Sequence, residues 1–172
     1  MKLHKISLAN RLYRIVWKIS YIVFFRYTPN FFFNWRRIIL MIFGAKLDVG
    51  VRVYPKVAIW SPKNLIMNKC SCLANDVEVY NVGKVCIGEN TVVSQRSYLL
   101  TASKDYSSGR RNLLVSDINI KNNVWIAASV TIGPGVTIGN NCVILLGSII
   151  FEDIIDDKKV RGIKNYIISD LK

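Results

Sequence analysis

A six-residue repeat of aliphatic side chains constrains the fold of this 172-residue chain more than any other feature. Isoleucines follow one another at steps of six, and a small or β-branched residue usually stands two positions before each: Ile120, Ile126, Ile132, Ile138, Ile144 and Ile150. Neither the 3.6-residue period of a helix nor the two-residue period of a strand produces this spacing. The chain must therefore turn a corner about every six residues.

The same step of six occurs earlier in three sets that are separated by eight residues: Leu47, Val53, Ile59; Met67, Leu73, Val79; and Ile87, Val93, Leu99. Five or six extended residues at ~3.3 Å rise make one short side, and three sides close a triangular coil. Stacking of coils at about 4.8 Å buries the aliphatic side chains. We therefore predict an all-β fold, a parallel β-helix. We expect its five coils at residues 47–66, 67–86, 87 to about 102, 118–137 and 138–150.

Residues suited to tight turns recur between the predicted strands. Glycine and asparagine tolerate a positive φ, and asparagine also hydrogen-bonds nearby backbone groups. They occur at the expected corners, as Gly88, Gly133 and Gly139 and as Asn90, Asn122, Asn123, Asn140 and Asn141. The turn residues and the aliphatic repeat thus predict the same coils.

One polar segment interrupts the repeat. Leu99 and Ile120 are 21 residues apart instead of eight, so about 13 residues are extra. They fall on LLTASKDYSSGRRN, residues 99–112, and we predict an excursion loop at about residues 103–117. Polar loops on rigid scaffolds commonly carry function, which makes Lys104 a candidate functional residue.

The N-terminal segment is basic and rich in aromatic residues. Residues 1–50 hold nine of the 24 Lys and Arg residues but only one of the 11 acidic residues. We predict helices at residues 8–26 and 31–43, the second capped by Asn30. Neither helix is apolar over the ~18–20 residues that a membrane span needs. We therefore divide the chain into a helical segment (1–46), the β-helix (47–150) and a C-terminal capping segment (151–172).

The first predicted helix is amphipathic. Its apolar residues keep helical spacing, whereas its basic residues lie elsewhere on the wheel: Leu12, Ile15, Ile19, Ile22 and Val23 against Arg11, Arg14 and Lys18. The apolar face either covers the end of the β-helix or lies on an anionic membrane surface. Nucleic-acid binding is disfavoured, because the basic residues alternate with apolar positions and no nucleic-acid-binding module is recognisable.

The cysteines predict neither a metal site nor a disulfide framework. Cys70, Cys72, Cys86 and Cys142 do not form paired C-x-x-C motifs, and the only histidine is His4. No signal-type cleavage site is recognisable. We therefore expect reduced thiols and a cytoplasmic protein.

Several stretches resemble the hexapeptide-repeat acyltransferases, whose fold is a left-handed parallel β-helix. NVWIAASVTIGPGVTIGNNCVI at 123–144 is typical of the acetyltransferase group. Three stretches are similar to the proposed colanic acid biosynthesis acetyltransferases: FNWRRIILMIFGAKL at 33–47, VYPKVAIWSPKNL at 53–65 and VYNVGKVCIGENTVVSQRSYLLTAS at 79–103. The resemblance implies a homotrimer that binds acetyl-CoA as co-substrate between neighbouring β-helices and acetylates a sugar hydroxyl.

The resemblance also implies site residues. The base that takes the hydroxyl proton in the family is a histidine on the excursion loop, in a segment like T-A-S-H-D-Y, and Lys104 stands at its position here. The implied catalytic residues are therefore Lys104, Asp105 and Tyr106. The implied substrate-binding residues are Glu78, Asn81, Ser103 and Trp125. The implied coenzyme-binding residues are Trp125, Ala127, Ala128, Gly147, Ser148, Arg161 and Lys164.

Departures from the family pattern leave the chemistry open. A free lysine has a pKa of ~10.4, and a pKa near 7 would require about 4.6 kcal/mol of preference for the neutral amine. Lys104 is therefore a general base, a cation that orients an acidic glycan or a coenzyme phosphate, or a solvated lysine on a site that has lost catalysis. On the implied coenzyme wall, Leu145 and Leu146 replace a Gly-Ala pair. Phe151, Glu152 and Asp153 replace a T-K-D-like segment, and residues 162–166 replace G-N-P-A-K.

These observations favour an acetyl-CoA-dependent O-acetyltransferase in the biosynthesis of a surface polysaccharide such as a capsule, exopolysaccharide or O-antigen. Its acceptor would be a glycan or a lipid-linked sugar. Residues 1–43 are the candidate for peripheral contact with the inner face of the cell membrane. The alternative is a catalytically impaired homologue that acts as a trimeric glycan-binding or scaffold protein.

Overall fold

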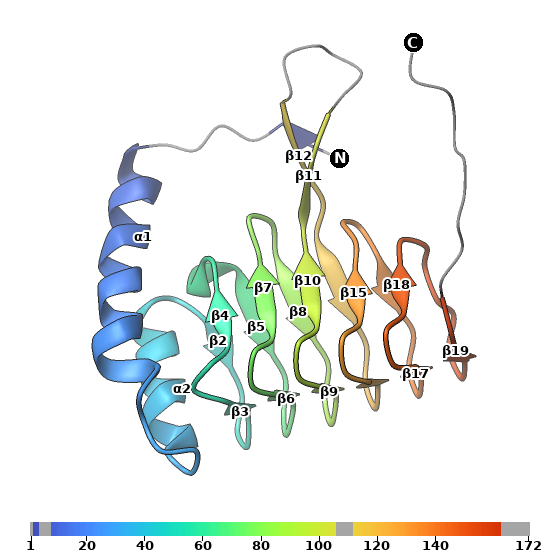
Figure 1. Cartoon of the computed structure of the whole chain (residues 1–172), viewed down its shortest axis with the longest axis horizontal. Coiled ribbons are helices and arrows are strands. Elements are labelled where there is room, and N and C mark those ends of the chain that lie inside the picture. Colours follow the sequence, from blue (N-terminus) through green and yellow to red (C-terminus); the bar gives the residue numbers. More distant parts are fainter. Residues whose placement is uncertain (1, 4–7, 106–111, 163–172) are drawn as a thin grey trace.

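The computed structural model describes residues 2–3, 8–105 and 112–162. Short parallel strands wind into a solenoid of stacked coils, and two helices lie at its N-terminal end (Figure 1). The strands of the five coils are β2 (Lys46–Leu47), β3 (Arg52–Val53) and β4 (Ala58–Ile59); β5 (Leu65–Met67), β6 (Cys72–Leu73) and β7 (Glu78–Tyr80); β8 (Val85–Ile87), β9 (Val92–Val93) and β10 (Tyr98–Leu100); β13 (Ile118–Ile120), β14 (Trp125–Ile126) and β15 (Thr131–Ile132); and β16 (Thr137–Ile138), β17 (Val143–Ile144) and β18 (Ile149–Ile150). The predicted parallel β-helix and its five coils are confirmed.

Each coil contributes one strand to each of three parallel sheets. Sheet 1 has the order β2-β5-β8-β13-β16, sheet 2 the order β3-β6-β9-β14-β17, and sheet 3 the order β4-β7-β10-β15-β18. β19 (Lys159–Val160) extends sheet 2 beyond the fifth coil. Every coil therefore runs from sheet 1 through sheet 2 to sheet 3.

The aliphatic repeat forms the core because its residues pair in register from coil to coil. In sheet 1, for example, Leu47, Met67, Ile87, Ile120 and Ile138 are successive partners. All residues of the repeat except Leu47 are buried. Full burial of one such side chain contributes about 1.5–3 kcal/mol, so the stack stabilises every coil through its neighbours.

In the last three coils, the corner between sheets 1 and 2 is built by asparagine, as predicted. Asn90, Asn123 and Asn141 have φ angles of 53°, 56° and 56°. Each donates from its side-chain amide to the equivalent side chain of the next coil, and the series ends at Asp157. Gly88 has a different role from the one predicted: its φ is not positive, but a Cβ there would collide with the backbone of Lys121 in the next coil.

The predicted excursion loop is an antiparallel hairpin, which the sequence did not reveal. β11 (Ala102–Lys104) pairs with β12 (Leu113–Val115), and β1 (Lys2–Leu3) pairs with the other edge of β12. The hairpin rises from the end of β10 (Figure 1). It therefore projects from the corner between sheets 3 and 1.

The N-terminal helices begin and end close to the predicted limits. α1 (Leu8–Ser20) continues into a π-helical turn, η1 (Tyr21–Phe25), and α2 (Phe33–Ile42) follows. The cap predicted at Asn30 is wrong, because α2 is preceded by Phe32 and has no side-chain cap. The Asn30 carbonyl instead accepts a hydrogen bond from the Arg36 guanidinium.

The helices pack on the first coil through a face that the sequence did not single out. Trp17, Phe25 and Leu40 are buried, and Nε1 of Trp17 donates to the Ile59 carbonyl at 2.7 Å. The predicted apolar stripe points away, and its Ile19 side chain is 59% exposed. The interpretation that this stripe covers the end of the β-helix is therefore wrong. No helix among the described residues is both long and apolar enough to cross a bilayer.

Candidate functional site

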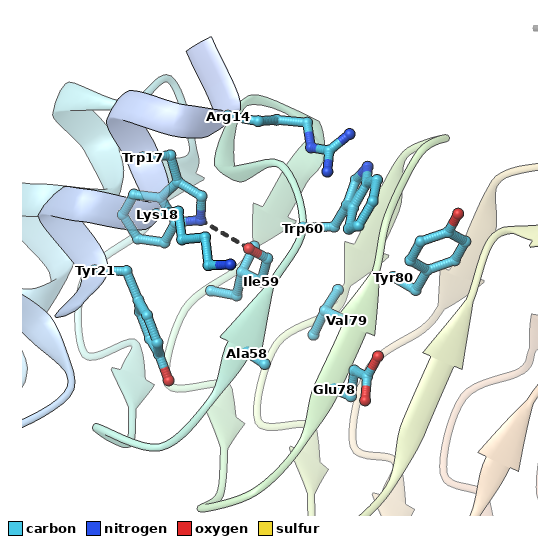
Figure 2. A pocket seen from close by; sticks show the side chains of 10 residues that line it. All are labelled: Arg14, Trp17, Lys18, Tyr21, Ala58, Ile59, Trp60, Glu78, Val79 and Tyr80. Carbon is cyan, nitrogen blue, oxygen red and sulfur yellow. Dashed lines mark hydrogen bonds between the residues drawn. The ribbon is translucent and has the colours of Figure 1, made fainter. Parts of the chain in front are cut away.

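A pocket of about 280 Å³ lies between the N-terminal helix and the outer face of sheet 3 (Figure 2). The helical wall comprises Arg14, Trp17 and Lys18 of α1 and Tyr21 of η1. The sheet wall comes from the first two coils, as Ala58, Ile59, Trp60, Glu78, Val79 and Tyr80. This pocket is therefore assembled from segments about 40 to 60 residues apart in the chain.

The sheet wall follows from the 20-residue coil. Trp60 and Tyr80 come directly after the inward-facing Ile59 and Val79, so their side chains point outward from successive coils. Their ring centroids lie 4.8 Å apart at an interplanar angle of 65°, the edge-to-face arrangement that aromatic pairs prefer. The Arg14 guanidinium lies over the Trp60 ring, 3.3 Å from its centroid. This cation–π contact fixes Arg14 at the mouth of the pocket.

The helical wall is held by hydrogen bonds to the solenoid. Besides the bond from Trp17 to Ile59, the Tyr13 hydroxyl accepts from the Lys63 backbone N–H at 3.3 Å, and it donates to the Phe43 carbonyl at the end of α2 at 2.7 Å. Burial raises the pKa of Tyr21 above its ordinary value of about 10, so its phenol stays protonated and can donate a hydrogen bond at neutral pH. The pocket thus combines fixed aromatic rings with the charges of Arg14, Lys18 and Glu78.

The pocket adjoins the excursion hairpin. The backbone N–H and the hydroxyl of Thr101 both donate to the Tyr80 carbonyl, at 3.1 and 2.9 Å. Three residues further on, Lys104 extends from β11 with an exposed side chain, next to an exposed Ser103 and a half-buried Asp105. Ser103 and Lys104 therefore lie beyond the Tyr80 end of sheet 3, whereas Glu78 stands at the start of β7, beside Tyr98 of β10. Tyr106 lies outside the described residues.

Asn81 has a different position from the one its predicted role requires. It is fully buried, its Oδ1 accepts from the Ser61 backbone at 2.9 Å, and its Nδ2 donates to the Ser61 carbonyl at 2.8 Å. Because both ends of the amide are engaged with the backbone, Asn81 fastens two coils together. It does not face the pocket, so the predicted acceptor contact through its side chain is corrected to a structural role.

The residues implied for coenzyme binding gather at the corner between sheets 2 and 3. Ala127, Leu145 and Arg161 occupy equivalent positions in successive turns, linked by hydrogen bonds from Ala127 to Ile144 and from Leu145 to Val160. Trp125 stands beside them on sheet 2, half-exposed, and its Nε1 donates to the Ser94 hydroxyl at 3.2 Å. Ala128 joins this corner through its carbonyl, which accepts from Gly147.

The residues at the corner between sheets 2 and 3 differ in how much free space surrounds them. Gly147 has a φ of 68°, and no atom lies within 4 Å of the position that a Cβ would occupy. Leu146 projects into solvent, whereas Leu145 is half-buried. Ser148 is fully buried, and its hydroxyl donates to the Leu145 carbonyl at 2.6 Å. The Ser148 side chain therefore has a structural role and does not make the predicted coenzyme contact. Lys164, the last residue implied for coenzyme binding, lies outside the described residues.

A single chain does not bring the pocket and the hairpin together with the residues implied for coenzyme binding. The pocket lies on the outer face of sheet 3 in the first two coils and the hairpin leaves the corner between sheets 3 and 1, whereas Trp125, Ala127 and Arg161 lie at or beside the corner between sheets 2 and 3 in the last coils. Among the described residues, no group of three His, Cys, Asp or Glu side chains is arranged to hold a metal ion. A site that used both groups would have to form between neighbouring copies of the chain.

Sequence reasoning missed most of the pocket. Two signals could have revealed it: the 20-residue spacing of Trp60 and Tyr80, and the four-residue spacing of Arg14 and Lys18 outside the aliphatic stripe. Neither signal indicates that these pairs face each other. That relation depends on which face of α1 packs against the solenoid.

Comparisons with known proteins agree with the fold and with part of the sequence pattern. The bacterial transferase hexapeptide (six repeats) family matches residues 117–150. WcaF of Escherichia coli K12, named for a proposed acetyltransferase role in colanic acid biosynthesis, is 33% identical over 147 residues, which are 86% of this chain and 81% of WcaF.

Two solved structures share the architecture. A maltose O-acetyltransferase from Clostridium difficile 630 superimposes with a TM-score of 0.82 at 24% identity, over 92% of this chain and 90% of its own. A hexapeptide-repeat acetyltransferase from Vibrio cholerae, solved with acetyl-CoA, gives a TM-score of 0.84 at 21% identity, over 96% and 91%. At these identities the two structures support the fold alone.

Proposed function

The chain belongs to the hexapeptide-repeat acetyltransferases, and on that basis we propose that it transfers the acetyl group of acetyl-CoA to a sugar hydroxyl during the assembly of a surface polysaccharide. Membership rests on the identity to WcaF over most of both chains. The observation that carries the sugar assignment is the pocket lined by Trp60, Tyr80, Arg14 and Glu78 at the base of the excursion hairpin.

The pocket suits a sugar ring. Aromatic rings such as Trp60 and Tyr80 offer an apolar surface to the C–H groups of a pyranose. Arg14, Lys18 and Glu78 supply donors and acceptors for its hydroxyl groups, or for an acidic substituent. Glu78 keeps the substrate-binding role predicted from the sequence, and Ser103 on the adjoining hairpin is a second polar contact.

The corner between sheets 2 and 3 suits the extended arm of the coenzyme. Ala127, Ala128 and Gly147 leave room along the corner, and Trp125 offers an apolar surface beside them. Arg161 is exposed at the last turn, where its guanidinium could bind a coenzyme phosphate. Leu146 then becomes an apolar contact at the edge of this groove.

The transfer forms one bond and breaks one. The acceptor hydroxyl oxygen attacks the thioester carbonyl, its proton passes to a base, and the C–S bond breaks to release the coenzyme thiolate. Lys104 and Asp105 are the candidates on the hairpin. In a trimer with sites between subunits, the hairpin and pocket of one chain would meet the corner between sheets 2 and 3 of its neighbour. We call this corner, with Trp125, Ala127 and Arg161, the coenzyme corner.

Titration calorimetry with acetyl-CoA tests the first half of this proposal. We expect saturable binding by the folded protein, with an affinity lowered about tenfold or more by Trp125→Ala or Arg161→Ala. Trp60→Ala, on the opposite edge, should leave coenzyme binding unchanged while reducing transfer to a sugar acceptor. Absence of heat at millimolar coenzyme would overturn the enzymatic proposal.

Replacement of Lys104 tests the second half of the proposal, in which a base on the hairpin takes the proton of the acceptor hydroxyl. If Lys104 is the base, Lys104→Ala lowers kcat about 100-fold or more without weakening coenzyme binding, and Lys104→His restores activity with an optimum nearer neutral pH. An alanine variant as active as the parent removes Lys104 from the mechanism. The same assay on His4→Ala then tests the only histidine, which follows Leu3 of β1 directly in the sequence.

A second function is favoured by the exposure of Lys104. The described chain leaves this lysine exposed, so its side chain is available to donate hydrogen bonds to an acidic substituent of a glycan. The protein would then be a trimeric, non-catalytic glycan-binding scaffold. Saturable glycan binding that Trp60→Ala abolishes, in a protein that does not bind acetyl-CoA, would establish this alternative.

A further inference from the structure

The two helices present a broad apolar surface to solvent. It comprises the outward stripe of α1 and η1 and the outward residues of α2, represented by Leu12, Ile15 and Ile19 and by Trp35, Ile38 and Ile42. We call these six residues and the apolar side chains between them the outer helical face. Large exposed apolar patches of this kind mark interaction sites in soluble proteins.

The outer helical face is continuous across both helices. Nε1 of Trp35 on α2 donates to the Phe24 carbonyl of η1 at 2.8 Å, and both side chains are about half-exposed. The helices lie at the N-terminal end of the solenoid (Figure 1), away from the last coils. Their other face already stabilises the first coil through Trp17, Phe25 and Leu40, whereas the six named side chains of the outer face are 46–76% exposed.

Charge decides what kind of partner fits this face. Residues 1–47 contain nine Lys or Arg residues and no Asp or Glu. Arg11 and Lys18 are exposed and seven residues apart, so they lie along one margin of the α1 stripe. Arg26 is exposed where the chain leaves η1. Two copies of such a segment would repel each other if they met face to face, whereas an anionic bilayer attracts the exposed Arg11, Lys18 and Arg26.

The shape of the surface agrees with a bilayer. A basic helix with an aliphatic face lies in the interface between headgroups and acyl chains, and its apolar side chains enter the hydrocarbon boundary. Trp35 and the 79%-exposed Tyr27 are aromatic residues of the kind that prefer this interface. Neither helix can span the membrane, so the chain would lie on it.

We propose that the outer helical face docks the protein onto an anionic membrane surface. Docking would hold the first coils at the bilayer. The pocket would lie there too, because Arg14 and Lys18 of its helical wall belong to the docked helix α1. Acceptors that are anchored in the membrane by a lipid would then reach the pocket preferentially. The docking itself does not depend on acetyl transfer, because it uses the face of α1 opposite Trp17.

Vesicle flotation tests the proposal, because bound protein floats whereas aggregates sink. The full chain should float with phosphatidylcholine vesicles that contain about one third phosphatidylglycerol. It should float much less with phosphatidylcholine alone or at about 0.5 M salt. The double variant Ile15→Glu/Ile19→Glu should lose about tenfold or more of the partition coefficient, since it removes apolar contact and adds anionic charge.

The matched control is Ile155→Glu, which alters a 71%-exposed isoleucine near the other end of the solenoid and should float like the parent. Thermal unfolding and acetyl-CoA binding, measured on the same variants, separate loss of docking from loss of fold or of the proposed enzyme. Failure of the parent to float at low salt would overturn the proposal. Unchanged flotation of the double variant would also overturn it. So would sedimentation showing that the parent assembles with itself through this face and that the double variant dissociates.

Discussion

Arg36 ties three separate segments together through one buried guanidinium. It donates from Nε to the Val53 carbonyl at 2.7 Å, and from Nη1 to the Thr28 hydroxyl and the Pro29 carbonyl at 2.8 and 2.7 Å. Nη2 reaches the Asn30 carbonyl. Burial lowers the pKa of Arg36, and these acceptors offset the cost of desolvating its charge. The residue therefore joins the turn before α2 to the first coil.

Arg36→Met should strongly destabilise the protein. The substitution leaves buried oxygens without a donor, and we expect the free energy of unfolding to fall by about 3 kcal/mol, measured by urea denaturation. Arg36→Lys should also lose stability, because one ammonium group cannot match the planar fork of donors. Arg11→Met, on an exposed arginine, should change stability by less than about 0.5 kcal/mol. A stable Arg36→Met variant would contradict this account.

At this scale the sequence indicated residue types more reliably than orientations. Asn81 and Ser148 were polar and near the expected clefts, yet both side chains turn inward and are engaged with the backbone. Ser148 stands two positions before Ile150, as the small residues of the repeat do, but the hydrogen bond that permits a buried hydroxyl there could not be predicted. Trp125 and Glu78 are exposed, as their predicted roles require.

At the corner between sheets 1 and 2, asparagine side chains cap backbone N–H groups of the preceding coil, and the last cap is an acidic residue. Asn122 and Asn140 cap the backbone N–H groups of Glu89 and Asn122 respectively, and Asp156 continues the series by accepting from the Asn140 backbone at 2.8 Å and from its side-chain amide at 3.1 Å. These hydrogen bonds lower the pKa of Asp156. A carboxylate thus ends the series of side-chain caps among the described coils.

Asp156 should stabilise the protein more at neutral pH than in acid. A group whose pKa is lowered by folding adds stability above its unfolded pKa of about 4, and this contribution is lost as the pH falls through the lower, folded pKa. We therefore expect Asp156→Asn to unfold at a lower temperature than the parent at pH 7. The difference should shrink when both are heated at progressively lower pH below about 4. A difference that stays constant throughout acid titration would exclude the role of the carboxylate.

Elements were predictable wherever one period governed them. The hexad located every coil because each repeat residue must be buried by the next coil. It said nothing of the hairpin, where the partner strands β11 and β12 pair across a segment without that period. The amphipathic pattern located α1 but not its packing. Trp17 and Tyr13, whose side chains both pack and hydrogen-bond, face the solenoid at Ile59 and Lys63, and the aliphatic stripe does not.

At the scale of the whole molecule, the proposed acetyl transfer would require an assembly if it uses both the pocket and the corner between sheets 2 and 3. The pocket wall of sheet 3 and the corner that holds Ala127 and Arg161 are fixed in one rigid solenoid, so no movement within a chain brings them face to face. A trimer with cyclic symmetry provides this contact three times, because each copy offers its pocket to one neighbour and its corner to the other. All three outer helical faces could then dock on the same bilayer, which multiplies their effective affinity.

Mixed assemblies test this arrangement directly. Trp60→Ala damages the pocket and Trp125→Ala damages the coenzyme corner, so each variant alone should be nearly inactive while sedimenting at three times the 19.6 kDa chain mass. In randomly mixed trimers, about one interface in four combines an intact pocket from one chain with an intact corner from its neighbour. Acetyl transfer should therefore recover to about a quarter of the parent activity after co-refolding. If both halves of the site belonged to the same chain, no mixture could contain an intact site, and activity would stay at the level of the separate variants.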